Sequence, residues 1–149
     1  MANQDNNTKR EILYKEIDLI QSCISRMAQN SFMVKGWVIT LVAACCAVSS
    51  LNLSEWKILF IFGALAIILF WYLDAYFLKM ERLYRFKYEW VINNRLKKDE
   101  FAFDLNPYNK QMWNTGKEEP SIIGVMFSKT LLPMYLLLLA FDTFALFVI

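Results

Sequence analysis

Three ionisable side chains, Lys35, Asp74 and Asp142, lie in or beside long apolar segments, where a charge is costly and therefore informative. Counted from the same predicted turn, Lys35 lies about 17 residues along one helix and Asp74 about 21 residues along the next, so their depths differ by roughly 6 Å. A lysine side chain can reach across that difference. We therefore expect an ion pair between Lys35 and Asp74 at the membrane boundary. The alternative is that lipid headgroups solvate each charge separately.

Asp142 interrupts the last apolar segment of the chain. If that segment enters the membrane near residue 130, Asp142 lies at mid-depth, level with Thr40 and Gly63. If it enters near residue 124, Asp142 reaches the outer headgroups. A carboxylate at mid-depth costs several kcal/mol unless it faces a wet cavity or a partner. Thr40 and Asp142 are therefore the candidate pore-lining or intramembrane polar residues, and interfacial placement of Asp142 is the alternative.

The residue types that most enzymes use are missing from the chain or form no suitable pattern. The sequence has no histidine, which removes the commonest general base, the usual zinc ligand and any Ser–His or Cys–His nucleophile pair. Its three cysteines form no metal-ligand or disulfide pattern, and it has no phosphate loop or dinucleotide fingerprint. We expect no enzyme activity, no cofactor and no metal site.

The composition is that of a small membrane protein. Of 149 residues, 57% are hydrophobic and 20% are charged, with only four Gly and three Pro, which is too apolar and too rarely interrupted for an ordinary soluble domain. The predicted fold is all-α, with transmembrane helices at 32–50 and 55–75, and a third within 121–149 after an interfacial lead-in. Residues 1–31 are predicted as a cytoplasmic amphipathic helix, and residues 76–120 as a cytoplasmic helix extension and loop.

The first two spans each adjoin amphipathic sequence without a helix breaker, which predicts a long antiparallel helical hairpin extending into the cytoplasm. Its apolar residues alternate spacings of three and four, the pattern of helices that pack on one another. For residues 1–31, a membrane-surface anchor is the alternative. The predicted packing residues are Leu13, Ile17, Ile20, Ile24, Met27, Phe77, Met80, Tyr84 and Tyr88. The predicted charged residues of this stalk are Glu81, Arg82 and Arg85.

Positive charge is distributed unevenly about the predicted spans. Only Lys57 lies near the hairpin turn, whereas most other Lys and Arg residues precede the first span or follow the second. The positive-inside rule then places the N-terminus and the stalk in the cytoplasm and the C-terminus outside. The basic run at 95–98 favours anionic lipid over nucleic acid, because Asp99 and Glu100 follow it at once. Nucleic acid is therefore not an expected partner.

Helical periodicity stops between residues 99 and 120. Asn106 and Pro107 predict the start of a short helix that runs from Tyr108 to Trp113. We expect the aromatic residues of this segment to pack on the stalk; an aromatic ligand box is the alternative.

Several of these segments resemble a known family. Residues 70–78 and 81–85, with Lys35-Gly36-Trp37 upstream and residues 127–130 downstream, are similar to the RipA family of bacterial octameric inner-membrane proteins. The resemblance covers most of the chain from residue 33 onward. It implies a homo-octameric ring in the bacterial inner (cytoplasmic) membrane, related to small pore-like accessory proteins of CRISPR and other antiphage systems. The Arg/His HEPN-like motif of some of those proteins cannot be transferred, because this chain has no histidine.

Self-association also has a physical reason. Three spans make a thin bundle in which Lys35, Asp74 and Asp142 are difficult to shield within one copy, and a homo-oligomeric ring with stalks packed by their apolar residues would shield them. The expected function is an oligomeric inner-membrane protein that forms a pore or alters membrane permeability, as an antiphage-defence accessory. The alternative is a non-conducting membrane scaffold that assembles a cytoplasmic protein partner.

Overall fold

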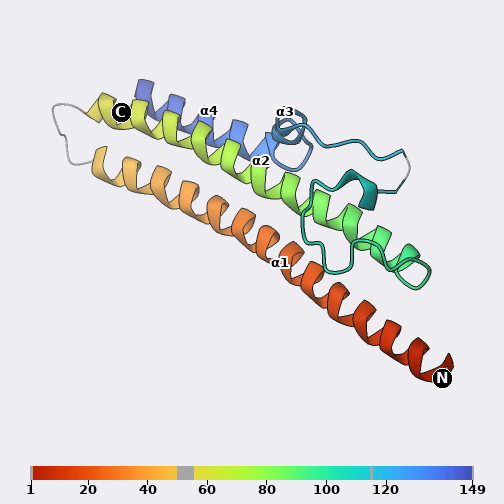
Figure 1. Ribbon diagram of the computed structural model, residues 1–149. Helices are drawn as coiled ribbons and strands as arrows, with labels where there is room; N and C mark the ends of the chain where they lie inside the picture. The colour runs from red at the N-terminus through yellow and green to blue at the C-terminus, as the bar shows by residue number, and fades with distance from the viewer. Residues whose placement is uncertain (1, 50–55, 115, 149) are drawn as a thin grey trace. The chain divides into compact units, whose positions relative to one another are not determined.

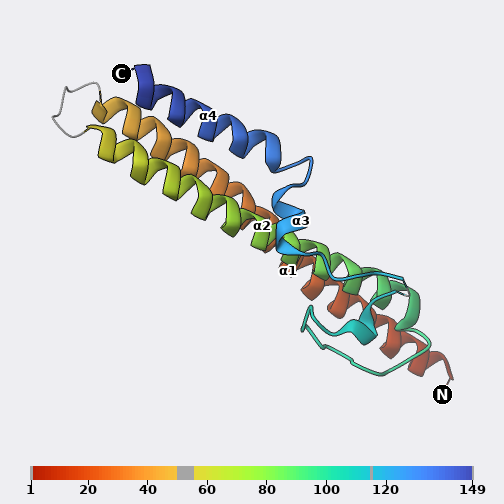
Figure 2. The same cartoon turned by 90° about the horizontal axis from the view of Figure 1, so that it is seen from above.

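The computed structural model describes residues 2–49, 56–114 and 116–148, and helices are the regular structure within them (Figures 1 and 2). The elements are α1 (Ala2–Ser49), α2 (Trp56–Asn94), the 3-10 turn η1 (Lys110–Met112), α3 (Ile122–Met126) and α4 (Leu132–Val148). No strand occurs in the described ranges. The predicted all-α class and the long helical hairpin are confirmed. The predicted turn between the two long helices lies in residues 50–55, outside the described residues.

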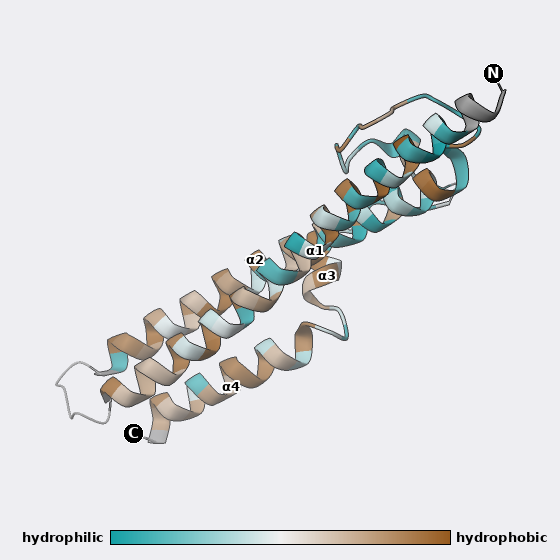
Figure 3. Cartoon of the chain, turned by 90° about the horizontal axis from the view of Figure 1, so that it is seen from below, coloured by the Kyte–Doolittle hydropathy of each residue, from teal (hydrophilic) through white to brown (hydrophobic). Residues whose placement is uncertain are grey.

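The two long helices are unbroken because their sequences contain no proline and one glycine each. With 48 and 39 residues, they are about 70 Å and about 60 Å long, which exceeds the roughly 30 Å hydrocarbon thickness of a bilayer. Both are long and apolar enough to cross a membrane. Figure 3 shows hydrophobic residues along one part of each helix and mixed residues along the other.

The chain divides into two compact units. The first, which we call the polar unit, combines the described residues of 1–28 with 79–120. The second, the apolar unit, combines 29–78 with the described residues of 121–149. Each long helix contributes one part to each unit.

The core of the polar unit consists of two clusters between α1, α2 and the following loop. Ile20, Val91 and Met112 are fully buried in the first cluster, and Leu83 is fully buried in the second. The predicted packing residues Leu13, Ile17, Ile20, Ile24 and Tyr88 belong to the first cluster, and Met27, Met80 and Tyr84 belong to the second. These residues pack inside one chain. Several of them stay partly exposed, and the expectation that they also join neighbouring copies stays a prediction.

A buried ion pair connects α1 to the end of α2 in the polar unit. Glu16 is 0% exposed and Arg95 is 2% exposed, and the two nitrogen-to-oxygen distances between them are 2.5 Å and 2.7 Å. Arg95 also donates to the backbone carbonyls of Lys98, Glu100 and Phe101. One guanidinium thus balances a buried carboxylate and closes the turn that follows α2.

The loop after α2 differs from its prediction. The expected helix from Tyr108 to Trp113 is reduced to η1, whose N-cap is Asn109 and not Asn106. Phe101 and Phe103 have a φ of 58°, a left-handed conformation that is costly for a bulky residue. The contacts of Arg95 and Glu16 with this segment hold that conformation.

The same loop is attached to α2 by a buried lysine and by aromatic packing. Lys87, 1% exposed, donates to the carbonyl of Asn106 at 2.8 Å and lies 3.4 Å from the Asp104 carboxylate. Burial lowers the pKa of Lys87, and the Asp104 charge opposes that shift. Trp113 packs edge-on against Phe86, as expected for aromatic residues that cover the stalk.

In the apolar unit, the last apolar stretch forms two helices and not one. Ser121 caps α3, with its hydroxyl accepting from the Gly124 N–H at 3.0 Å, and α4 begins only at Leu132. The 17 residues of α4 extend about 26 Å. α4 is an apolar helix shorter than the two candidate spans.

The buried Glu16–Arg95 pair predicts a large effect of removing one partner. Glu16→Ala leaves an unpaired buried guanidinium, and we expect the polar unit to lose about 3–5 kcal/mol of stability. Amide hydrogen exchange of residues 83–94 in the purified protein measures this loss. Arg85→Ala is the matched control, because the Arg85 side chain, 61% exposed, pairs with Glu81 on the surface and its removal costs at most about 1 kcal/mol. Equal effects of the two substitutions would contradict the assignment.

Candidate functional site

The most highly connected polar group in the apolar unit is the carboxylate of Asp74 on α2, which is 0% exposed. Ser31 and Lys35 reach it from α1. They are one helical turn apart and so lie on the same face of that helix. Tyr135 reaches it from α4. Three side chains from two other helices thus meet at the carboxylate of Asp74.

The geometry leaves this carboxylate fully paired. Lys35 Nζ lies 2.8 Å from Oδ1 and 2.7 Å from Oδ2 of Asp74. The Ser31 hydroxyl donates to Oδ1 at 2.5 Å, and the Tyr135 hydroxyl donates to Oδ2 at 3.0 Å. Lys35 also donates to Ser31 Oγ at 2.6 Å. Buried charges are tolerated when they are paired and hydrogen-bonded in this way.

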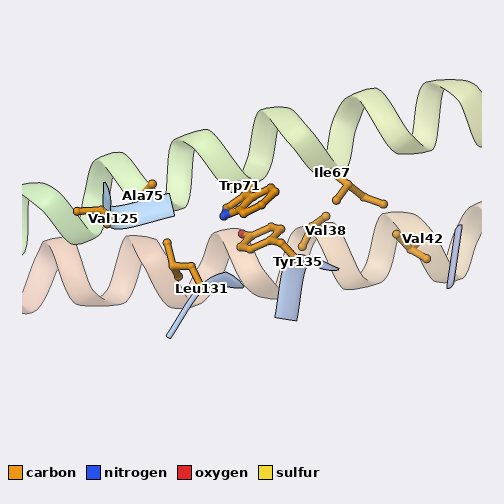
Figure 4. Packing of buried hydrophobic residues seen from close by; sticks show 8 residues of the cluster. All are labelled: Val38, Val42, Ile67, Trp71, Ala75, Val125, Leu131 and Tyr135. Atoms are coloured by element: carbon orange, nitrogen blue, oxygen red, sulfur yellow. The ribbon is translucent and has the colours of Figure 1, made fainter. Parts of the chain in front are cut away.

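An apolar cluster surrounds the site (Figure 4). The rings of Trp71 and Tyr135 stack with centroids 5.7 Å apart and an interplanar angle of 7°, and Trp71 Nε1 donates to the carbonyl of Met126 at 3.0 Å. Ala75, on α2 beside Asp74, is 0% exposed. The buried members of the cluster are Val38, Val42, Ile67, Trp71, Ala75, Val125, Leu131 and Tyr135. This packing keeps Tyr135 within reach of Asp74 and keeps water away from the Asp74 carboxylate, whereas the Lys35 side chain is 25% exposed.

The structure brings together Lys35 and Asp74, which the sequence suggested as a pair. Sequence reasoning missed Ser31 and Tyr135. The available signals were the one-turn spacing from Ser31 to Lys35 and a single tyrosine in the otherwise aliphatic stretch of residues 131–139. The polar atoms of this arrangement bind one another. Its chemical capacity is to hold three helices at a fixed level.

Asp142 lies elsewhere in the apolar unit. α4 begins at Leu132, and Asp142 lies beside Gly63 of α2, whereas its depth in a membrane stays a prediction. A Cβ atom built on Gly63 would lie 2.8 Å from Asp142 Oδ1. Asp142 is 2% exposed and therefore does not line an outer face of the single chain.

Thr40 is exposed on α1, and its hydroxyl donates to the carbonyl of Gly36 at 2.9 Å. Thr40 and Asp142 thus do not share a surface of the single chain. The stalk charges lie in the polar unit, where Arg85 and Glu81 form an exposed i, i+4 pair at 2.7 Å and Arg82 is half-buried. Phe77 belongs to the apolar unit and lines a shallow groove with Trp37 of α1.

No protein-family model, curated protein or solved structure matches this chain. The resemblance to the RipA family accordingly stays a prediction.

The Asp74 site predicts strong coupling between its members. Lys35→Met leaves the buried carboxylate without its counter-ion, and Asp74→Leu leaves the lysine without its partner, so we expect each single substitution to cost about 3–5 kcal/mol. The double substitution should cost less than the sum of the singles, because neither charge is then left alone. Thermal unfolding in detergent measures all three.

Removal of the Tyr135 hydroxyl should lower the stability of the apolar unit by a smaller amount. Tyr135→Phe keeps the stack on Trp71 and removes one hydrogen bond to a charged group, at a cost of about 1.5–3 kcal/mol. Thr40→Ala is the control, since Thr40 bonds only its own helix backbone on an exposed face. Additive costs for Lys35 and Asp74, or no cost at Tyr135, would refute the description of one coupled site.

Proposed function

We propose that this chain is a homo-oligomeric protein of the cytoplasmic membrane that forms a pore or otherwise alters membrane permeability. In this proposal α4 is the third span, the polar unit lies in the cytoplasm and the C-terminus lies outside. The resemblance to the RipA family adds an octameric state and a role beside antiphage defence to the proposal.

The supporting observation is a difference between the exposed faces of the apolar unit. Successive residues of an α-helix are about 100° apart around its axis. By this spacing one face of α1 contains Gly36, Thr40, Ala43, Ala44 and Ala47, and all five are exposed. Beside these small residues α1 also exposes the large side chains of Trp37 and Ile39, and the other two helices expose mainly large apolar side chains. On α2 these include Ile61, Phe62, Leu65, Ile68 and Leu69, and on α4 they include Leu137, Phe141, Phe144 and Phe147.

The two kinds of surface suit different neighbours. Large apolar side chains are well accommodated by lipid tails, whereas small residues gain little from lipid and let helix backbones approach closely. The small face of α1 therefore fits the inside of a ring, between copies or around a central path. The Thr40 oxygen, although it donates to Gly36, can still accept a hydrogen bond from water. Thr40 is the residue that we assign to the path.

One earlier reason for self-association no longer applies. The charges that were expected to need a ring for shielding are shielded within one copy, because Asp74 is 0% exposed and Asp142 is 2% exposed. The case for association thus rests on the small face of α1 and not on the burial of charge.

A specific observation also favours the alternative, a non-conducting scaffold. Within residues 36–48, 58–73 and 132–147, every exposed residue that the structure describes is uncharged, whereas ion-selective pores often use rings of charged side chains. A scaffold would bind its cytoplasmic protein partner through the polar unit, whose loop exposes Phe101 and Phe103.

Reconstitution distinguishes these functions. We expect the purified protein to form a single oligomer in detergent, measured by light scattering, and to release a small dye from liposomes. Ala44→Leu adds bulk to the small face and should abolish both assembly and leakage. Leu65→Phe, which adds bulk to a lipid-facing site of α2, should change neither.

The outcomes separate the two candidates. An oligomer that releases no dye would support the scaffold. A monomer in both detergent and lipid would refute self-association and with it the pore.

A further inference from the structure

The apolar unit contains two buried aspartates with opposite surroundings. The carboxylate of Asp74 meets three donor side chains, Ser31, Lys35 and Tyr135. Asp142 is equally buried, at 2% exposed, yet its Oδ1 has no hydrogen-bond partner among the described residues. The first site is built for a negative charge. The second leaves one oxygen of that charge without a donor among the described residues.

The groups that face Asp142 come from two helices. α2 presents Gly63, whose missing side chain lets Oδ1 approach the helix closely, since a Cβ atom there would lie 2.8 Å from Oδ1. α1 presents the thiols of Cys45 and Cys46, the titratable groups whose charges would interact with Asp142. Neither thiol can supply a positive charge, and a thiol is a weak hydrogen-bond donor. No lysine or arginine is recorded in contact with this carboxyl within the described ranges.

An ionised carboxylate in such surroundings is strongly unfavourable, since burial removes its hydration and no hydrogen bond or counter-ion compensates for that loss. A neutral carboxylic acid of the same shape avoids most of this cost. A Cβ atom built on Gly63 would lie only 2.8 Å from Oδ1. This close approach of α4 to α2 therefore favours the neutral acid, and the smallest ligand that neutralises the carboxylate is a proton.

We propose that Asp142 is a proton-binding site that couples the packing of α4 to pH. With the proton bound, the acid packs against Gly63 and the three helices stay together. When the proton leaves for water, the carboxylate needs hydration, and this part of α4 separates from α2. Raising the pH therefore loosens α4, and lowering it restores the packing.

A groove of about 400 Å³ lies between α1 and α4, and its walls include Cys46 and Phe141, the residue before Asp142. In this proposal the groove is the route by which the proton of Asp142 exchanges with water. The inference goes beyond permeability, because it assigns a ligand and a trigger to the bundle whether or not the protein conducts.

Infrared spectroscopy of the full chain in lipid nanodiscs tests the proton directly. We expect the carbonyl band of a protonated carboxylic acid at neutral pH, and we expect that band to disappear as the pH is raised. Asp142→Asn should remove the band. Asp74→Asn, which alters the other buried aspartate, should leave it in place. Absence of the band at neutral pH, or its survival in Asp142→Asn, would overturn the proposal.

A second variant keeps the test independent of how well Asp142→Asn folds. Gly63→Ala puts a methyl carbon only 2.8 Å from Oδ1, which is closer than a normal contact. The carboxyl must therefore shift, and the band should disappear at a lower pH than in the unaltered protein. Amide exchange of residues 138–146, corrected for intrinsic rates, should accelerate over the pH range in which the band is lost, and it should not do so in Asp142→Asn.

The coupling between the proton and α4 packing would be contradicted if the band disappeared at the same pH in Gly63→Ala as in the unaltered protein. It would also be contradicted if amide exchange did not accelerate when the band is lost. Neither measurement depends on oligomer size or dye release. Failure of the proposed pore and failure of the proton site are therefore distinguishable.

Discussion

The apolar unit depends on one carboxylate and its donors. Asp74 lies where helices from three separate parts of the chain meet, and its cost in an apolar interior is offset only if Lys35, Ser31 and Tyr135 all reach it. That condition fixes the level of α1 against α2 and of α4 against both, because sliding any helix by one residue would break a contact. Apolar packing alone tolerates such shifts, whereas the polar cluster does not.

The hairpin was predictable because its signals are local. Absence of breakers and a 3-4 apolar spacing are enough to predict long helices that pack on one another, and counting from one turn brought Lys35 and Asp74 to similar depth. The register of α4 was not predictable, since residues 121–149 are apolar almost throughout and the turn at 127–131 carries no glycine or proline signal before Pro133. Ser31 and Tyr135 were missed because a hydroxyl on a helix gives no sign of its partner.

The loop after α2 shows a different limit of sequence reasoning. Phe101 and Phe103 have left-handed backbones, which no local propensity would assign to phenylalanine. The conformation is set by Arg95, whose guanidinium binds Glu16 and three carbonyls of the same turn. A buried ion pair between residues far apart in sequence thus overrides the backbone preference of the two phenylalanines. Such a pair leaves no pattern in the spacing of the sequence.

The order of the donors along the chain has a consequence for biosynthesis. Ser31, Lys35 and Asp74 all belong to the first two helices, whereas Tyr135 is translated some sixty residues after Asp74. The hairpin can therefore neutralise its own charges before the last helix leaves the ribosome. In the proposed membrane protein, the insertion machinery then receives a paired unit in place of two isolated ions. Tyr135 then adds its hydrogen bond to a carboxylate whose charge is already paired.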